Sequence, residues 1–291
     1  MPNTLLTPSV IAKEALLVLR KNAVMANLVH RDFSKEFAAV GDTVTIRKPA
    51  TFVANEFSES AGITVQSATE TGIPVQMNKL LDVSFEVTSK EMALSVDDFS
   101  AQFIVPAMQA FADKIDSLLL ALQSNVTNRI VQTNKVQDDI VTLRTHLTKH
   151  STPLTERSYV VSSNEEARML KSELFVSADK VGDDGTALRE ASLGRKFGFD
   201  CYVDQNTDNV SNLYGMAFHK NAFALVTRAL ALPEGASNAY IENYEGFGLR
   251  VVSDYDIAKK KDIISIDMLC GVKVLDDKLA AVLTSSAGLG A

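Results

Sequence analysis

The feature that most constrains the fold is the tract TFVANEFSESAGITVQSATETGIPVQ, residues 51–76. The segment before it, GDTVTIRKP, and the segment after it, LLDVSFEVTSKE, both alternate apolar and polar residues as strands do. The tract itself has no helical period and too few large side chains to form a core. Compact domains rarely carry such a long connection without a use for it. We therefore expect a two-armed hairpin that projects from its own globule.

This hairpin keeps a weak strand period along both arms, which Gly62 and Gly72 interrupt. With about 14 residues in each arm and ~3.3 Å per residue, it would extend on the order of 45 Å. A hairpin of that length has to pack on a surface outside its own domain. The side chains expected to make this intersubunit contact are Phe52, Phe57, Ile63, Val65, Ile73 and Val75.

The composition is that of a globular protein and argues against two classes of function. Apolar residues make up 46% of the 291 residues and charged residues 22%, enough for a core in one large domain or two modest ones. The net charge of −7 argues against a broad basic face that binds nucleic acid. The sequence has no apolar run of about 18 residues and no signal-peptide pattern, so we expect no membrane partner.

Helical periodicity is clearest in three segments. Thr7 and Pro8 have the pattern of an N-cap and a first helical residue, which predicts a helix over residues 8–21. Its apolar face must dock either on the body of the chain or on a neighbour. The expected contacts of this N-terminal arm are Ile11, Ala15, Val18 and Leu19. Two further helices are predicted, the longest over residues 106–123 and another over residues 136–149.

The second half of the chain is predicted to mix strands with short helices. Ser163 and Glu166 have the spacing of a capping box, which predicts a helix from Ser163 to about Leu174. Strands are predicted at residues 157–163, 199–203, 246–256 and 262–275, with a strand–turn–strand unit at residues 215–230. Together with the helices, these elements indicate an α+β fold.

The polar residues form no recognisable catalytic motif. The sequence lacks the P-loop, dinucleotide-binding, nucleophile-elbow, HExxH and CxxC patterns, so we expect no enzyme, cofactor or metal. His146 and His150 have the i, i+4 spacing of metal ligands, but no carboxylate lies between them. A helix C-terminus also suits basic residues. The alternative is a metal-dependent hydrolase built on this histidine pair.

Other polar or reactive features are expected to be structural. Cys201 and Cys270 lie in apolar strand-like runs and are expected to be buried thiols, neither a disulfide nor a nucleophile. Residues 204–209, DQNTDN, lack the glycine and glutamate of a calcium loop and are expected to form a polar turn. We expect a surface loop at residues 182–186. The three lysines at 259–261 are expected in a solvated turn, with docking to an acidic neighbour as the alternative.

Five stretches, in this order, resemble the major capsid proteins of tailed bacteriophages with the Hong Kong 97-type fold. The likeness is greatest to the branch found in short-tailed phages. The stretches are TPSVIAKEALLVLRKNAVMANLV, GDTVTIRKP, ELFVSADKVGDDGTALREASLGRKFGFDCYVDQN, AFHKNAFALVTRAL and GFGLRVVSDYDIAKKKDIISIDMLCGVKVL. They are structural rather than catalytic signatures, and the resemblance covers essentially the whole chain. It implies an α+β capsid fold.

The resemblance also implies a domain layout. The implied parts are an N-terminal arm at 1–40, an extended loop (the E-loop) with its flanking strands at 41–88, a peripheral (P) domain with a long spine helix at 89–133, an axial (A) domain at 134–245, and a P-domain return with the C-terminal tail at 246–291. The late P-domain strands are implied to pair with those flanking the E-loop.

The function implied by the resemblance is assembly. Hexamers and pentamers held by A-domain contacts would build the icosahedral capsid of a virion, which encloses double-stranded DNA without sequence-specific binding. Assembly would occur in the host bacterial cytoplasm, with a separate scaffolding protein and a portal as partners. Lys48 and Lys79 flank the E-loop, but no covalent cross-link is expected. The alternative with the same fold is an encapsulin-like bacterial shell protein.

Overall fold

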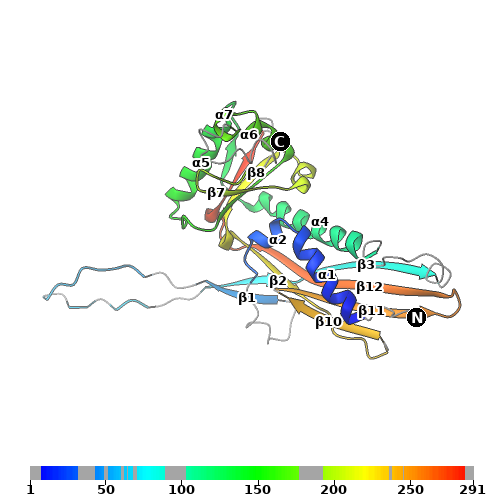
Figure 1. Cartoon of the computed structure of the whole chain (residues 1–291). Helices are drawn as coiled ribbons and strands as arrows, with labels where there is room; N and C mark the ends of the chain where they lie inside the picture. The colour runs from blue at the N-terminus through cyan, green and yellow to red at the C-terminus, as the bar shows by residue number, and fades with distance from the viewer. Residues whose placement is uncertain are drawn as a thin grey trace.

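The computed structural model describes residues 8–31, 43–48, 52–59, 62–63, 65–67, 71–88, 103–176, 193–235, 238–244 and 246–285. It has three parts, which Figure 1 shows. The long-sheet domain is an elongated sheet with helices on one face. The short-sheet domain is a smaller α/β globule above one end of that sheet. The third part, the projecting hairpin, leaves the body as a thin two-stranded arm.

Five strands form the sheet of the long-sheet domain, in the order β10–β11–β12–β3, with β9 also paired to β12. The strands are β3 (Lys79–Thr88), β9 (Phe223–Arg228), β10 (Asn238–Tyr244), β11 (Phe247–Asp256) and β12 (Lys261–Val274). The central strand is β12, which pairs antiparallel with β3 along one side and with β11 and then β9 along the other. The implied pairing of late strands with the strands flanking the E-loop is therefore confirmed for β3, which follows the projecting tract. The strand before the tract, residues 43–48, pairs with residues 71–76 instead.

One face of this sheet is covered by α1 (Pro8–Asn22), α2 (Met25–Leu28) and α4 (Val105–Ala121). Pro106 lies in the first turn of α4, where its missing N–H breaks no intrahelical bond, and the helix continues as η2 (Leu122–Asn125). Apolar strand residues point at these helices and form the largest core with them, among them Leu249, Val251, Ile264, Ile266 and Met268. On the opposite face β3 exposes Asp82, Ser84 and Glu86.

Six strands form the sheet of the short-sheet domain, in the order β4–β13–β8–β5–β7–β6. They are β4 (Arg129–Val131), β5 (Arg157–Val161), β6 (Arg195–Lys196), β7 (Phe199–Val203), β8 (Leu213–His219) and β13 (Ala280–Thr284). One face packs under α5 (Val136–Lys149), α6 (Ser163–Leu170) and α7 (Glu173–Val176). The other face, with Val160, Met216 and Phe218, shares the core of α4. The spine helix therefore joins the two domains.

The two sheets do not follow the expected domain boundaries. Strands β9 and β10, expected in the A domain, belong to the long sheet, whereas β4 and β13, expected in the P domain, belong to the short sheet. The predicted strand–turn–strand unit is present, but the short helix η4 (Lys220–Ala222) takes the chain from one sheet to the other. Strand partners as distant as β4 and β13 leave no local pattern, so periodicity alone could not place them.

Two smaller predictions also need correction. The N-cap of α6 is Ser162, whose hydroxyl accepts a bond from the Glu165 N–H at 3.3 Å; the Ser163 hydroxyl instead bonds to Asp208. The helix ends at Leu170, before a separate short helix, α7. The acidic segment at 182–186 lies outside the described residues. Within the described part of the chain, no helix has the length and hydrophobicity to span a bilayer.

Candidate assembly interface

The base of the projecting hairpin is anchored in its own chain. Strands β1 (Thr43–Lys48) and β2 (Thr71–Gln76) pair antiparallel, with Val44 opposite Val75 and Ile46 opposite Ile73. Val75 is fully buried in a small core that the hairpin forms with Ala224 and Val226 of β9. The prediction that Val75 contacts a neighbouring subunit is therefore wrong. The strand alternation is real, but on this face of β2 it buries Val75 in the core at the base of the hairpin. Ile73, on the same face, is half-buried.

Two close approaches hold the hairpin base against β12. A Cβ atom on Gly271 would lie 2.4 Å from the carbonyl oxygen of Gln76, so only glycine lets the two backbones come this close. Beside it, the Lys273 ammonium donates a hydrogen bond to the carbonyl of Pro74 at 2.8 Å. The body of the protein thus fixes the point from which the hairpin projects.

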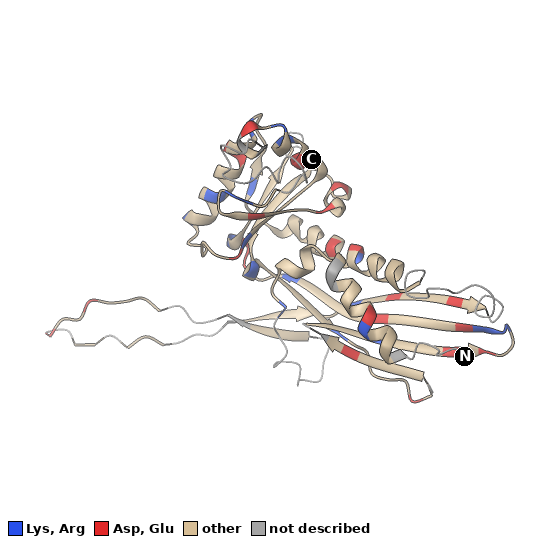
Figure 2. Ribbon diagram, viewed as in Figure 1, with Lys and Arg blue, Asp and Glu red and all other residues tan. Residues whose placement is uncertain are grey.

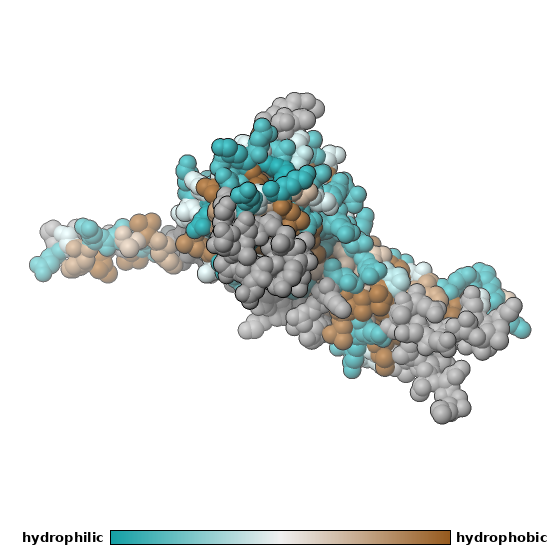
Figure 3. All heavy atoms as spheres, turned by 45° about the horizontal axis from the view of Figure 1, so that its top comes forward, coloured by the Kyte–Doolittle hydropathy of each residue, from teal (hydrophilic) through white to brown (hydrophobic). Residues whose placement is uncertain are grey.

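Beyond its base, the hairpin exposes large apolar side chains. The exposed fractions are 64% for Phe52, 68% for Phe57, 80% for Ile63 and 85% for Val65. Apolar residues recur along the arm in the space-filling view (Figure 3). Contiguous exposed apolar surface on a soluble chain marks an interaction site or an aggregation hazard. Four of the six predicted contact residues are therefore available to a second molecule.

The distal arms are tied together by specific hydrogen bonds. The backbone N–H of Val53 donates to Gln66 Oε1 at 2.9 Å, and Gln66 Nε2 donates to the Val53 carbonyl at 2.5 Å. Near the tip, the Gly62 N–H donates to the carbonyl of Ser58 at 2.8 Å, with Gly62 at a φ of +70°. These bonds hold the described parts of the two arms side by side.

The N-terminal helix docks on its own body. Ile11, Ala15 and Leu19 are buried and Val18 is half-buried against the main core, where α1 packs on α4, β10 and β11. This decides between the two docking surfaces left open by the sequence. The outer side of the helix exposes Val10 and Leu17 instead.

A buried carboxylate fixes the turn after this helix. Asp116 of α4 accepts hydrogen bonds from the N–H groups of Val24 at 2.7 Å and Ala26 at 2.9 Å, at the start of α2. It is only 2% exposed. Burial raises the pKa of Asp116 to about 7, against the opposing effect of the backbone hydrogen bonds. The N-terminal segment and the spine helix are therefore joined by a titratable group.

The histidine pair has little of what a metal site needs. The rings of His146 and His150 lie 4.8 Å apart between centroids at the end of α5. Burial, His150 and Lys149 lower the pKa of His146. Nearby cations repel a metal ion, and no group of three or more His, Cys, Asp or Glu side chains could hold one in the part of the chain that the structure describes. The geometry therefore lends no support to the hydrolase alternative.

The remaining singled-out residues have structural roles. Residues 204–209 form a polar turn, in which Asp204 caps the 3-10 helix η3 (Gln205–Asn209). The thiols of Cys201 and Cys270 are free, and burial raises their pKa values to about 12 and about 11, which makes them poor nucleophiles. Residues 257–260 form a turn that holds Lys259 and Lys260 as predicted, whereas Lys261 is half-buried at the start of β12 and pairs with Glu86.

The most perturbed carboxylate of the short-sheet domain also lies inside the fold. Burial raises the pKa of Glu165 to about 7. Arg168 donates hydrogen bonds to Glu165 at 2.5 Å and to Asp139 at 2.9 Å, which links α6 to α5. Glu165 and Asp139 are fully buried, so this network stabilises the packing of two helices rather than serving a substrate.

Comparisons with known proteins identify the fold. No family model matches the sequence, and no curated protein matches it. Solved structures do match. A structure from Mycobacterium phage Che8 has 19% identity and a TM-score of 0.66, with 90% of each chain covered. The capsid of cyanophage P-SCSP1u has 12% identity and a TM-score of 0.63, with 85% of this chain and 84% of that chain covered; the capsid of a native GTA particle has 14% identity and a TM-score of 0.60, with 94% of this chain and 91% of that chain covered. The chain has the Hong Kong 97-type capsid fold, as predicted.

Proposed function

We propose that this chain is the major capsid protein of a tailed phage and assembles into the icosahedral shell around its double-stranded DNA. The observation that carries the proposal is the projecting hairpin. Its base is locked into the body of the chain, whereas the four predicted contact residues of its distal part are between 64% and 85% exposed. A second copy is the surface that would cover them. The shared fold with phage capsid structures supports the same role.

In this proposal the hairpin is the E-loop and lies across the long-sheet domain of the adjacent copy. Its extended arms can add backbone hydrogen bonds to a sheet edge while alternate side chains become buried. A specific contact of this kind usually buries about 800 Å² on each partner. The long-sheet domain acts as the P domain, and the short-sheet domain acts as the A domain that makes hexamers and pentamers.

The other proposed partners follow from the same role. A separate scaffolding protein and a portal would take part in assembly, which would occur in the host bacterial cytoplasm. The net charge of −7 suits a wall that encloses DNA without binding it tightly. No catalytic activity is proposed, because the two carboxyl groups whose pKa values burial raises to about 7, Asp116 and Glu165, lie inside the fold.

The test removes the distal hairpin and keeps its base. Residues 52–67 are replaced by a short Gly-Ser turn, so that β1, β2 and the buried Val75 remain. We expect the subunit to keep its circular dichroism spectrum and unfolding midpoint, while negative-stain microscopy shows no closed shells. The matched control replaces the exposed polar residues Asn55 and Ser67 with alanine in the intact hairpin and should leave assembly unchanged.

Shell formation by the shortened variant at the wild-type yield would contradict the proposal. The contents of wild-type shells, expressed with the neighbouring gene products, separate the two shell functions. Packaged DNA supports the phage capsid, whereas a single enclosed enzyme indicates the encapsulin-like alternative.

A further inference from the structure

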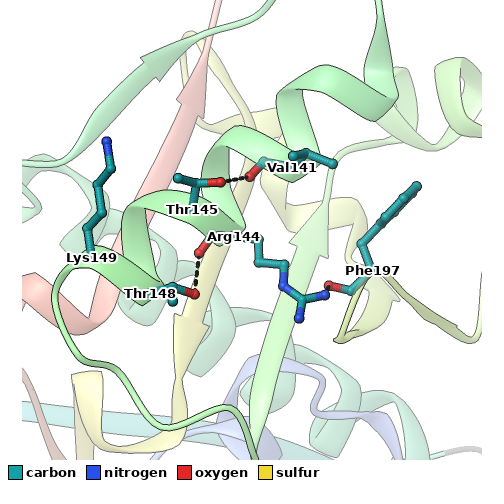
Figure 4. Close-up of a pocket in the computed structure, with 6 residues that line it drawn as sticks. All are labelled: Val141, Arg144, Thr145, Thr148, Lys149 and Phe197. Atoms are coloured by element: carbon teal, nitrogen blue, oxygen red, sulfur yellow. Dashed lines mark hydrogen bonds between the residues drawn. The ribbon is translucent and has the colours of Figure 1, made fainter.

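A shallow groove of about 640 Å³ lies on the outer face of α5, away from the core of the short-sheet domain. It is lined by Val141, Arg144, Thr145, Thr148, Lys149 and Phe197, which Figure 4 shows. Val141 and Phe197 are exposed apolar residues, and Arg144 and Lys149 supply two positive charges beside them. The proposed E-loop contact leaves this surface without a role.

The threonines of this face have already satisfied their hydroxyl donors. Thr142, Thr145 and Thr148 are exposed, and each donates to the carbonyl four residues earlier, at 2.7, 2.8 and 2.9 Å. Figure 4 shows two of these bonds. Burying a polar group is costly mainly when its hydrogen bonds to water are not replaced. Because these bonds are internal, covering the outer face of α5 costs less than covering an ordinary polar helix face.

The edge of the groove is held in a strained conformation. Phe197 and Gly198 form the turn between β6 and β7, with φ values of +48° and +86°. Asn, Asp or Gly is usual at such positions, because a bulky side chain at positive φ is unfavourable. Arg144 holds the turn by donating to the Phe197 carbonyl at 2.8 Å, and the ring packs near Phe175 while remaining 38% exposed. A strained backbone that holds an exposed phenyl ring beside α5 indicates that the ring contacts another molecule there.

The surface formed by η3 and the adjoining part of α4 has the complementary charge. Arg144 and Lys149 are exposed in the groove, whereas Asp113 of α4 and Asp208 of η3 are exposed outside it. Figure 2 shows basic residues on the α5 side of the domain and acidic residues on the η3 side. Within one chain η3 packs on α4, β8 and the start of α6, where Asp208 bonds to Ser163, and it contributes no residue to the α5 groove.

We propose that the α5 groove binds the η3 turn of a second copy of this chain. Such a contact joins two different surfaces, so repeating it around an axis closes a ring. The projecting hairpin leaves the molecule on the same side as α5 (Figure 1). The same neighbouring copy would therefore contact both the hairpin and the α5 groove. That neighbour presents its η3 side in return. The inference rests on the proposed function and assigns the lateral contact within the capsomer.

Charge reversal tests the contact. Lys149→Glu places a carboxylate opposite the acidic η3 turn in place of a cation, and is expected to raise the critical subunit concentration for shell formation about tenfold or more. Adding Asp208→Lys to the same chain restores opposite charges and should return the critical concentration toward the wild-type value. The matched control is Lys171→Glu, an exposed lysine of the same domain outside the groove, which should change little. Sedimentation velocity over a concentration series measures all four proteins.

Two further variants keep the inference testable if Asp208→Lys destabilises the subunit through its bonds to Ser163. Phe197→Asn suits the turn and should preserve subunit stability while weakening assembly. Lys149→Cys combined with Asn209→Cys should form an intermolecular disulfide in assembled shells, which neither single variant forms.

The outcomes separate this inference from the function on which it rests. If wild-type shells form, Lys149→Glu assembles normally and the cysteine pair does not cross-link, the groove contact is wrong and the proposed function stands. If the wild-type chain does not assemble even with its neighbouring gene products, both the groove contact and the proposed function are wrong.

Discussion

The carboxyl group of Asp116 provides the sharpest prediction about stability. It lies on the spine helix, is 2% exposed, and accepts the N–H groups of Val24 and Ala26 at 2.7 and 2.9 Å. Burial raises its pKa from 3.8 to about 7, and the nearby Asp204 adds to this rise. The folded chain therefore binds a proton that the unfolded chain has released at the same pH.

The sign of the pH dependence follows from this difference. Because the folded pKa is the higher one, the contribution is complete below about pH 4 and is lost as the pH rises to about 7. Within that window one such group changes the free energy of unfolding by about 1.4 kcal/mol per pH unit. Across the window the change is on the order of 4 kcal/mol.

The perturbation is Asp116→Asn, which cannot titrate. Its amide oxygen keeps one backbone hydrogen bond, but its NH₂ group faces the second donor, so the variant should lose about 1–3 kcal/mol at pH 5. The loss should shrink by about 1.4 kcal/mol for each pH unit up to about pH 7. Urea unfolding of unassembled subunits at several pH values measures this difference. Glu165 titrates in both proteins and cancels.

The matched control is Asp113→Asn, which removes a carboxylate from the exposed side of the same helix. A stability difference between wild type and Asp116→Asn that stays constant from pH 5 to pH 8 would show that the buried carboxyl is not protonated in the folded chain. The reasoning from burial to proton uptake would then be refuted.

Two other predictions concern the hairpin and its anchor. Val75→Asp buries a charge and should unfold or strongly destabilise the subunit, whereas Val65→Asp should leave the unfolding midpoint unchanged and abolish shell assembly. Equal effects of the two variants in thermal unfolding would contradict the division into base and distal arm. Gly271→Ala forces its Cβ into the backbone of β2 and should destabilise by more than about 1 kcal/mol, with faster amide exchange in β1 and β2; unchanged exchange would show that the approach is not tight.

Local patterning was sufficient for most helices and strands. The helix predicted over residues 136–149 is α5, and the helix predicted over residues 8–21 differs from α1 by one residue, because apolar spacing and caps are short-range signals. The projecting hairpin was predictable for the same reason, since a tract without core-forming side chains has to lie outside the core.

The candidate interface was predicted only in part. Alternation identified Val65 and Val75 alike, yet one is 85% exposed and the other fully buried. The strand period predicts which face of the hairpin a side chain lies on. Whether that face is buried depends on the tertiary structure, which packs Val75 of β2 against β9 and leaves Val65 exposed. The groove on α5 could not be predicted from the sequence. Phe197 reaches the groove through a turn with positive φ, and phenylalanine is not a residue type that indicates such a turn.

The sequence by itself determined the elements, the absence of a recognisable catalytic motif and the existence of a long arm, since each depends on residues near one another in the chain. Only the tertiary structure decided which sheet each strand joins, that α1 docks on its own spine helix, and that Asp116 is a buried cap. Those outcomes depend on groups such as Val24 and Asp116, which lie 92 residues apart and meet only in the folded chain. Burial and charge pairing act on that spatial arrangement, which no local window of the sequence contains.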